Sequence, residues 1–222
     1  MEFGHNEWQT RGLRYNPFHT IVAPRPIGWT STINSSGEAN LAPFAYFNAV
    51  NTNPEQVMLG ISNRGHMHKE KYGFELNSSK DTLANILDTR EFVINLVTKE
   101  LAHAMNKSSE NYGPGVNEFE KSGVTTEDSR VVKPPRVKET PIALECRLWR
   151  SITLPQNGDI GTTMLIGDVV STYIRDDLIV DGVLDIKRIT TIGRLGGRDY
   201  CYVSKENTFQ LTWPDNYTKG AW

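Results

Sequence analysis

The sequence predicts a mostly β protein with a few helices, folded as a closed or partly closed β-barrel. Three observations support this class: short runs of β-branched and aromatic residues, turn residues at short spacing between them, and only two segments with helical periodicity. Closing the sheet would also remove exposed strand edges. With 222 residues, 38% of them hydrophobic, we expect one domain over 1–222, with an irregular N-terminal lead-in and a loop-rich segment at 108–140.

The first predicted strands follow the irregular residues 1–20. Pro24 and Pro26 lack amide hydrogens, so the chain is expected to bend before it enters the sheet. The polar sequence NSSGEAN at 34–40 is typical of a hairpin turn. The strands expected in this part of the chain cover residues 29–33, 41–50 and 55–62.

A short amphipathic helix is the clearest element, and we expect it at 78–89. Ser79 or Asp81 is the expected N-cap, because both side chains accept hydrogen bonds from free backbone amides. The apolar side chains that share one helical face are Leu83, Ile86 and Leu87.

The rest of the chain is predicted to be mostly strands and loops. Residues 91–98 alternate in the manner of a strand buried on one or both faces, and 99–109 is expected to be a second short helix. The segment 108–140 is rich in glycine and proline, which is typical of a lid, a partner contact or a binding loop. Further strands are expected at 142–154, 162–174 and 199–205.

The first strand and its return carry hydroxyl groups beside aromatic rings. The first strand contributes Trp29, Thr30, Ser31 and Thr32. An ordinary strand also favours β-branched residues, but the return strand adds Phe44 and the donor–acceptor side chain of Asn48. Aromatic walls with a few polar groups are typical of a small-molecule cofactor site.

The start of the helix at 78–89 is a candidate phosphate site. Helix N-termini carry unpaired amides and partial positive charge, and Lys80 and Thr82 add a full charge and a hydroxyl donor. Asp81 would repel a phosphate, so it is expected to cap the helix or orient Lys80. Arg64 is either a second phosphate partner or a surface arginine, and an ordinary capped surface helix is the alternative for the whole segment.

Four motifs occur in a fixed order along the chain. They are PRPIGWTST, G-x-x-N-L-A-P-F-x-x-F-N, K-D-T-x-x-N-I followed by EFVINLV, and GRLGGRDY. Together they resemble the flavin reductase-like, FMN-binding split-barrel family in its flavoredoxin-like branch, over residues 15–205. The resemblance implies an FMN-binding split β-barrel of Greek-key type that forms a homodimer, with FMN near the subunit boundary.

The resemblance also implies roles for individual residues. Those that would contact the flavin ring and ribityl chain are Trp29, Thr30, Ser31, Thr32, Phe44, Ala45, Phe47 and Asn48. Those that would hold the phosphate are Ser62, Arg64, Lys80, Asp81 and Thr82. Those that would close the site or receive a nicotinamide donor are Arg194, Gly196, Gly197 and Tyr200. Many relatives carry a serine where Ala45 stands, so backbone amides must replace its hydroxyl.

The implied function is an FMN-binding oxidoreductase. Hydride or electrons would pass from NADH, NADPH or a protein donor through FMN to free flavin, a redox protein or a small molecule. We assign no catalytic side chain, because the flavin itself supplies the redox chemistry. The alternative is a non-catalytic flavin-binding or storage module. A related oxidase acting on a pyridoxine phosphate is disfavoured, since the basic cluster that such a substrate needs is missing.

Composition and motifs argue against several other classes. The net charge is −2 with both signs interspersed, so no nucleic-acid partner is expected. No apolar run approaches ~18 residues, so no membrane span is expected. The N-terminus lacks the apolar run of a secretory signal, and Cys146 and Cys201 are expected to be reduced, which together predict a cytoplasmic protein.

No metal site is expected either. His66 and His68 lie two residues apart, but no third ligand is near them in the sequence, and they are interpreted as surface histidines. His103 is expected to be structural or partly exposed on the second helix. The hydrolase, zinc-protease and P-loop motifs are absent from the sequence.

Overall fold

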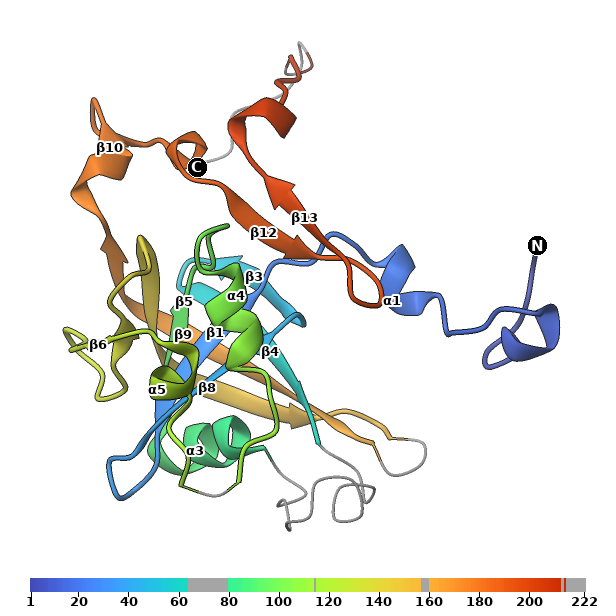
Figure 1. Cartoon of the computed structure of the whole chain (residues 1–222), viewed down its shortest axis with the longest axis horizontal. Helices are drawn as coiled ribbons and strands as arrows, with labels where there is room; N and C mark the ends of the chain where they lie inside the picture. The colour runs from blue at the N-terminus through green and yellow to red at the C-terminus, as the bar shows by residue number, and fades with distance from the viewer. Residues whose placement is uncertain (64–79, 114, 157–159, 213, 215–222) are drawn as a thin grey trace.

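The computed structural model describes residues 1–63, 80–113, 115–156, 160–212 and 214. Its centre is a seven-stranded sheet in the order β2-β1-β5-β8-β9-β4-β3, in which all neighbouring strands are antiparallel (Figure 1). The strands are β1 (Gly28–Ile33), β2 (Ala39–Phe44), β3 (Phe47–Thr52), β4 (Glu55–Ser62), β5 (Glu91–Asn95), β8 (Ile142–Thr153) and β9 (Thr162–Ile174). The sheet curls around a core, but within the described residues its outer strands β2 and β3 do not pair with each other, so the barrel stays open.

The turn between β1 and β2 forms where the sequence predicts it. The Asn34 side-chain oxygen accepts hydrogen bonds from the amides of Ser36 at 3.0 Å and Glu38 at 2.9 Å. An asparagine that bonds its own backbone in this way fixes a tight turn without secondary structure. The β1–β2 hairpin therefore follows directly from local sequence.

The predicted return strand at 41–50 is wrong in one respect, because it divides into two. β2 ends at Phe44, and β3 starts at Phe47 on the opposite edge of the sheet. The intervening Tyr46 lies close against β4, where the Gly60 amide donates to the Tyr46 carbonyl at 2.7 Å. A Cβ on Gly60 would lie 2.9 Å from the Tyr46 Cβ, so glycine permits this close approach. Only Ala45 and Tyr46 join β2 to β3, so the curled sheet brings its two edge strands together at this bend, and the strand order beyond it is of Greek-key type.

Helix α3 (Asp81–Thr89) confirms the predicted amphipathic helix, with two corrections. Leu83 and Ile86 are buried together with Thr82 and Asn85, and this choice of face leaves Leu87 at its edge, 45% exposed. The N-cap position belongs to Lys80 and has no side-chain cap, so the prediction of an Asp81 cap is wrong. Ser79, the other candidate, lies outside the described residues.

The segment 108–140 is not a lid, contrary to one interpretation of its composition. After α4 (Ala102–Lys107), it forms α5 (Glu118–Ser122) and the short strands β6 (Thr126–Glu127) and β7 (Arg136–Val137). Phe119 of α5 is 2% exposed and packs in the same cluster as Trp29 and Leu41. The segment therefore covers one face of the sheet and completes the core.

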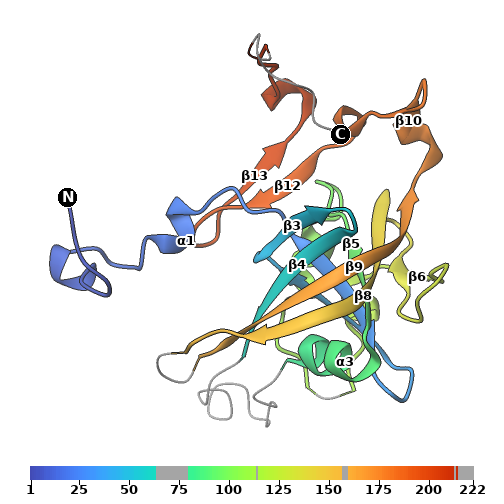
Figure 2. The ribbon, with the colours of Figure 1, turned by 180° about the vertical axis from the view of Figure 1, so that it is seen from behind.

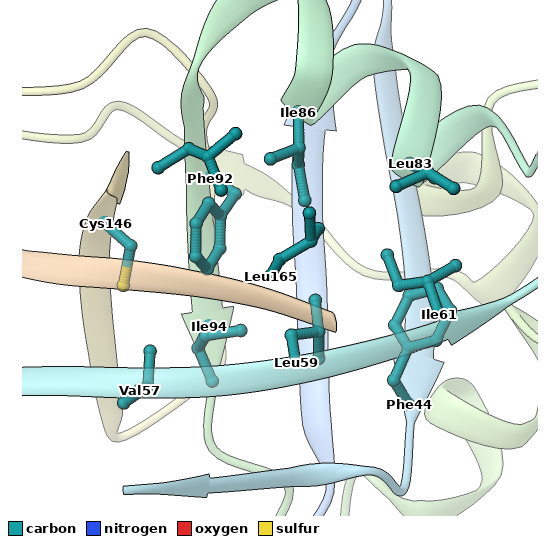
Figure 3. Packing of buried hydrophobic residues seen from close by; sticks show 11 residues of the cluster. Phe44, Val57, Leu59, Ile61, Leu83, Ile86, Phe92, Ile94, Cys146 and Leu165 are labelled. Atoms are coloured by element: carbon teal, nitrogen blue, oxygen red, sulfur yellow. The ribbon is translucent and has the colours of Figure 1, made fainter. Parts of the chain in front are cut away.

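The core consists of two main clusters. One lies between α3 and the inner face of the sheet and includes Phe92, Leu59 and Leu165 (Figure 3). The other surrounds Trp29 beneath α4 and α5. Because β5 contributes Phe92 and Ile94 to the first cluster and packs Val93 on its other face, the strand is buried on both sides.

The later predicted strands are confirmed as β8, β9 and β13, and a hairpin extends beyond the sheet. The remaining strands are β10 (Ile179–Val180), β11 (Val183–Leu184), β12 (Thr191–Arg194) and β13 (Tyr200–Val203). The short helices are α1 (Phe18–Ile21), η1 (Gln9–Arg11), η2 (Asp176–Leu178), η3 (Ile186–Arg188) and η4 (Lys205–Asn207). Figure 2 shows α1 and the β12–β13 hairpin projecting away from the sheet, on the side opposite α3. In the described part of the chain, no helix is both long and apolar enough to span a membrane.

Candidate functional site

A cavity of about 1390 Å³ opens where the sheet, α4 and the β12–β13 hairpin meet. Its walls come from the bend between β2 and β3, the end of β4, the residue before α3, one side of α4, the start of β9 and the turn after β12. The volume exceeds the ~300–1,000 Å³ of an ordinary small-molecule pocket. A ligand the size of a nucleotide therefore fits with space remaining.

Seven of the predicted site residues line this cavity. They are Phe44, Ala45, Ser62, Lys80, Arg194, Gly197 and Tyr200. They come from β2, β4, the start of α3 and the β12–β13 hairpin, which are distant in sequence. Arg25 and Ile27 of the first motif line the cavity as well, so the fold brings all four sequence motifs to one place.

The end of the cavity near α3 is suited to an anion. Lys80 stands at the N-cap of a nine-residue helix with no side-chain cap, and its Nζ lies 5.3 Å from the centre of the Phe44 ring. The amides at a helix N-terminus and an ammonium group together favour phosphate. Ser62 and Thr162 share a hydroxyl–hydroxyl bond of 2.8 Å at the same end, so one of the two hydroxyl groups keeps its proton available for a ligand.

The first-strand residues do not line the cavity, and their contact with a flavin stays a prediction. Trp29, Thr30, Ser31 and Thr32 are each 0% exposed. The Trp29 indole donates to Ser108 Oγ at 2.9 Å, and Thr30 Oγ1 donates to the carbonyl of Gly28 at 3.1 Å. Because these groups are buried and bonded within the protein, they build the core.

Thr82 is also buried and bonded within the protein, and its phosphate contact stays a prediction. Its hydroxyl oxygen accepts a 2.9 Å bond from the Asn40 amide, which also donates to Thr32 Oγ1 at 3.2 Å. Asn85 donates to the same Thr32 oxygen at 3.0 Å. This buried network ties α3 to β1 and β2, and such a network is stabilising because its donors are satisfied. The hydroxyl therefore anchors the helix and does not reach the cavity.

Four further predicted residues also lie away from the cavity lining, namely Phe47, Asn48, Asp81 and Gly196. The Phe47 ring packs against the core beside Gly28, and Asn48 is exposed on the outer strand β3, where its side chain accepts from the Ala49 amide at 2.9 Å. Asp81 is exposed in the first turn of α3, where a carboxylate complements the helix dipole. Arg64, His66 and His68 lie outside the described residues.

The other end of the cavity is built around Arg25. Its guanidinium donates to the backbone carbonyls of His19, Val22 and Leu195, the last at 2.8 Å. Its backbone pairs with Arg194 through bonds of 2.9 and 2.8 Å. Arg25 thereby fastens the segment containing α1 to the β12–β13 hairpin.

The turn of this hairpin is held by its own residues. Arg194 donates to the Tyr200 hydroxyl and to the Gly197 carbonyl, and its guanidinium lies 4.5 Å from the centre of the Tyr200 ring. Gly197 has φ +57°, which favours glycine. A Cβ on Gly196 would lie 2.1 Å from Thr20 Oγ1, so the turn packs tightly on the end of α1. These contacts hold the turn of the hairpin in place along one side of the cavity.

Sequence reasoning missed several residues of the lining. His19 and Tyr46 both line the cavity, and His19 Nδ1 lies 3.1 Å from the Tyr46 hydroxyl. His103 and Asn106, one helical turn apart on α4, face the same space. Tyr46 lies within the second sequence motif, so it could have been predicted as a site residue. The sequence around the α4 residues gives no sign of a site.

The lining carries positive charge. It includes Lys80, Arg25, Arg194 and Arg198, and none of its described residues is an aspartate or glutamate. This contrasts with the net charge of −2 of the whole chain. No group of three or more potential metal ligands occurs among the residues that the structure describes. The arrangement therefore favours an anionic organic ligand.

Comparison with known proteins gives consistent results. The model of the flavin reductase like domain matches residues 22–188. An uncharacterized protein of Aquifex aeolicus (strain VF5) is 41% identical over 180 residues, which cover 81% of this chain and 85% of that protein.

Solved structures agree over almost the whole chain. Nitrilotriacetate monooxygenase component B from Bacillus cereus superimposes with a TM-score of 0.81 at 28% identity, covering 95% of this chain and 98% of that one. Flavoredoxin of Desulfovibrio vulgaris (Miyazaki F) superimposes with a TM-score of 0.69 at 18% identity, covering 86% and 91%, a likeness that concerns the fold.

Proposed function

The chain belongs to the flavin reductase-like domain family and has its split-barrel fold, and on this premise we propose that it is an FMN-binding oxidoreductase. One observation supports the proposal above all: the large, positively charged cavity begins at Lys80, at the start of α3. An aromatic ring system with a phosphate tail matches this combination of Phe44, Tyr46 and a cationic end. The cavity fits FMN in size and in charge.

We assign the phosphate of FMN to Lys80, Ser62 and the first amides of α3. Phe44 lies beside Lys80 and offers an apolar surface to the flavin. Ala45 lacks the hydroxyl found in many relatives, so its backbone serves in place of a side chain. When bound, FMN supplies the capacity to accept a hydride or electrons and to pass them on.

The protein contributes position and access. No nucleophile or strong acid is required of the cavity residues, because the cofactor carries the redox chemistry. We place the electron donor, NADH or NADPH, at the β12–β13 end near Arg194 and Tyr200. The Bacillus cereus relative is a monooxygenase component, which supports an acceptor that is itself a protein or a flavin used by one. A small-molecule acceptor is the other outcome.

We also propose that the protein works as a homodimer in the cytoplasm. Large apolar side chains more than half exposed on the N-terminal arm and C-terminal segments include Phe18, Ile21, Val183 and Phe209. Soluble monomers rarely expose so much apolar surface in extended segments. Both cysteines are free thiols, which suits a reducing compartment. Light scattering should give twice the chain mass of 25.0 kDa.

The direct test of the function is reconstitution with FMN. The purified chain should bind FMN, and NADH or NADPH should bleach its absorbance near the flavin maximum under anaerobic conditions. If the flavin is bleached but no acceptor is turned over, or if neither donor bleaches it, the alternative function of a flavin-binding or storage module is supported. A protein that takes up no FMN contradicts the proposal.

The phosphate assignment has its own test. Lys80→Ala should weaken FMN binding by about tenfold or more, because a charge-assisted hydrogen bond contributes roughly 1.5–3 kcal/mol. Lys121→Ala is the matched control, since Lys121 is exposed at the end of α5 and does not line the cavity. Equal FMN affinity in both variants, measured by fluorescence titration, would show that the phosphate lies elsewhere.

A further inference from the structure

We propose that the electron acceptor is a quinone, that Tyr46 gives it a proton, and that His19 positions the Tyr46 hydroxyl and returns the proton to it. The inference rests on the proposed function, because it takes the reduced flavin as the source of the electrons. It goes beyond that function by naming a catalytic residue, its positioning residue and the chemical class of the acceptor.

The first observation is a hydrogen bond between two side chains of the cavity lining. His19 of α1 and Tyr46 of the bend between β2 and β3 both line the cavity, and His19 Nδ1 lies 3.1 Å from the Tyr46 hydroxyl oxygen. A phenol bonded to an imidazole can give its proton to a ligand and regain one through the imidazole. In the described lining, no other tyrosine hydroxyl has a histidine partner, and that of Tyr200 accepts from Arg194.

The second observation is that both residues are held by their backbones. The Tyr46 carbonyl accepts from the Gly60 amide at 2.7 Å, and the chain there lies close against β4. The His19 carbonyl accepts from the Arg25 guanidinium. Figures 1 and 2 both place α1 beside the turn of the β12–β13 hairpin. The pair is therefore built by the fold, from two segments that are distant in sequence.

The third observation is the position of the pair between the flavin and solvent. Tyr46 follows two residues after Phe44, whose ring the proposed function assigns to the flavin. Two residues of extended chain span at most ~7 Å, so Tyr46 lies next to the place where an acceptor would contact the flavin. His19 is exposed, so water can replace a proton that it gives away.

The fourth observation concerns the kind of acceptor. The charged side chains of the described lining are all lysine or arginine, and none is aspartate or glutamate. A lining of donors suits a ligand whose polar atoms are all acceptors. A quinone has two carbonyl oxygens on a flat ring, which also fits the aromatic side chains Phe44 and Tyr200. Negative charge that develops on a quinone oxygen during reduction would be stabilised by the cationic lining.

The proposed step balances in atoms and electrons. One quinone oxygen gains a proton and two electrons, as a hydride equivalent from the reduced flavin, which returns to its oxidised form. The other quinone oxygen takes the Tyr46 proton as the O–H bond of Tyr46 breaks, so both C=O bonds become C–OH bonds of a hydroquinone. His19 then gives its Nδ1 proton to the Tyr46 oxygen and takes another from water.

The first test measures binding without turnover. The probe is 4-nitrophenolate, whose anionic oxygen resembles that of the reduced quinone, titrated by absorbance into the protein with and without FMN. Tyr46→Phe should weaken its binding by about tenfold or more, because a hydrogen bond to a charged oxygen is lost. Tyr15→Phe is the matched control, since Tyr15 is 72% exposed and does not line the cavity. Equal affinities in the two variants would contradict a donor at Tyr46.

The second test compares two acceptors of the reduced, FMN-loaded protein under anaerobic conditions. Duroquinone needs a proton and has no free ring carbon to react with the partly exposed Cys201 thiol, whereas ferricyanide takes electrons alone. The ratio of the duroquinone rate to the ferricyanide rate should fall about a hundredfold in Tyr46→Phe, as for loss of a general acid. It should stay at the unaltered value in Tyr15→Phe, and an unchanged ratio in Tyr46→Phe would overturn the proposal.

The role of His19 has a readout that packing alone would not change. The same ratio should fall in His19→Ala and recover when imidazole is added to the solution. A loss that imidazole does not restore would make His19 a structural residue and contradict its part in the proposal. If the chain takes up no FMN, the proposed function fails, whereas the 4-nitrophenolate titration of the FMN-free protein still decides whether Tyr46 is a donor.

Discussion

The fold gives the two cysteine thiols different exposure and therefore different reactivity. Cys146 is fully buried on β8, whereas Cys201 on β13 is partly exposed, and both are free thiols as expected from their distance in sequence. Burial raises the pKa of the Cys146 thiol well above its ordinary value, and the nearby carboxylates Glu145 and Asp168 raise it further. Because the thiolate is the reactive form, Cys146 should be inert in the native state.

We predict the number of thiols per chain that react with a disulfide reagent. Native protein at pH 8 should react rapidly with a disulfide reagent at one thiol per chain, and denatured protein at two. Cys201→Ser should abolish the rapid phase and leave the slow one. Equal labelling rates for both thiols in the native protein, measured by absorbance and checked by mass spectrometry of peptides, would show that the β8 core opens readily.

At the scale of residues, the predicted long cationic side chains that the structure describes line the cavity, whereas the predicted hydroxyl residues of β1 and Thr82 do not. Lys80 and Arg194 reach the cavity, as long cationic side chains do when the backbone passes nearby. Thr32 and Thr82 have the same chemistry whether they bind a ligand or an internal asparagine, and only the packing of α3 on β1 and β2 decides between the two. That packing depends on contacts between segments distant in sequence.

At the scale of elements, local patterns determine hairpins and helices, whereas strand neighbours depend on the whole chain. The β1–β2 turn and the apolar face of α3 are local features and were predicted. The placement of β3 on the far edge from β2, and of β5 between β1 and β8, arises from pairing between distant segments. The polar composition of 108–140 also concealed α5, because a five-residue helix shows too little periodicity to detect.

The role of α5 gives a prediction about stability. Phe119→Ala should lower the free energy of unfolding by about 3–5 kcal/mol, because it opens a cavity in a fully packed core. Val131→Ala in the same segment should change it by less than about 1 kcal/mol, since Val131 is 40% exposed. Urea unfolding followed by fluorescence measures both. A loss in Phe119→Ala as small as in the control would restore the interpretation of this segment as a detachable lid.

At the scale of the whole molecule, the open barrel and the projecting hairpin together make the site. The sheet leaves its edges β2 and β3 unjoined in the described residues, and the cavity collects residues from the bend between them, from α4 and from the distant β12–β13 hairpin. Arg25 joins the N-terminal arm to that hairpin through Leu195 and Arg194. A ligand in the cavity therefore contacts parts of the chain that otherwise share few bonds. Its binding should stabilise the folded state of the sheet, α4 and the β12–β13 hairpin together.

This coupling predicts a thermal shift that does not depend on activity. A ligand at 100 times its Kd stabilises the native state by about 2.7 kcal/mol, which raises the Tm of a chain this size by roughly 5–10 °C. FMN should produce that shift in the unaltered protein and in Arg198→Ala, but about half of it or less at the same concentration in Lys80→Ala, because a tenfold higher Kd reduces the stabilisation to about 1.4 kcal/mol. Because Lys80 begins α3 and Arg198 lies beyond β12, this contrast separates the two ends of the cavity. The same shift in all three proteins would mean that FMN binds outside the cavity, since neither cationic end would then contribute to its affinity.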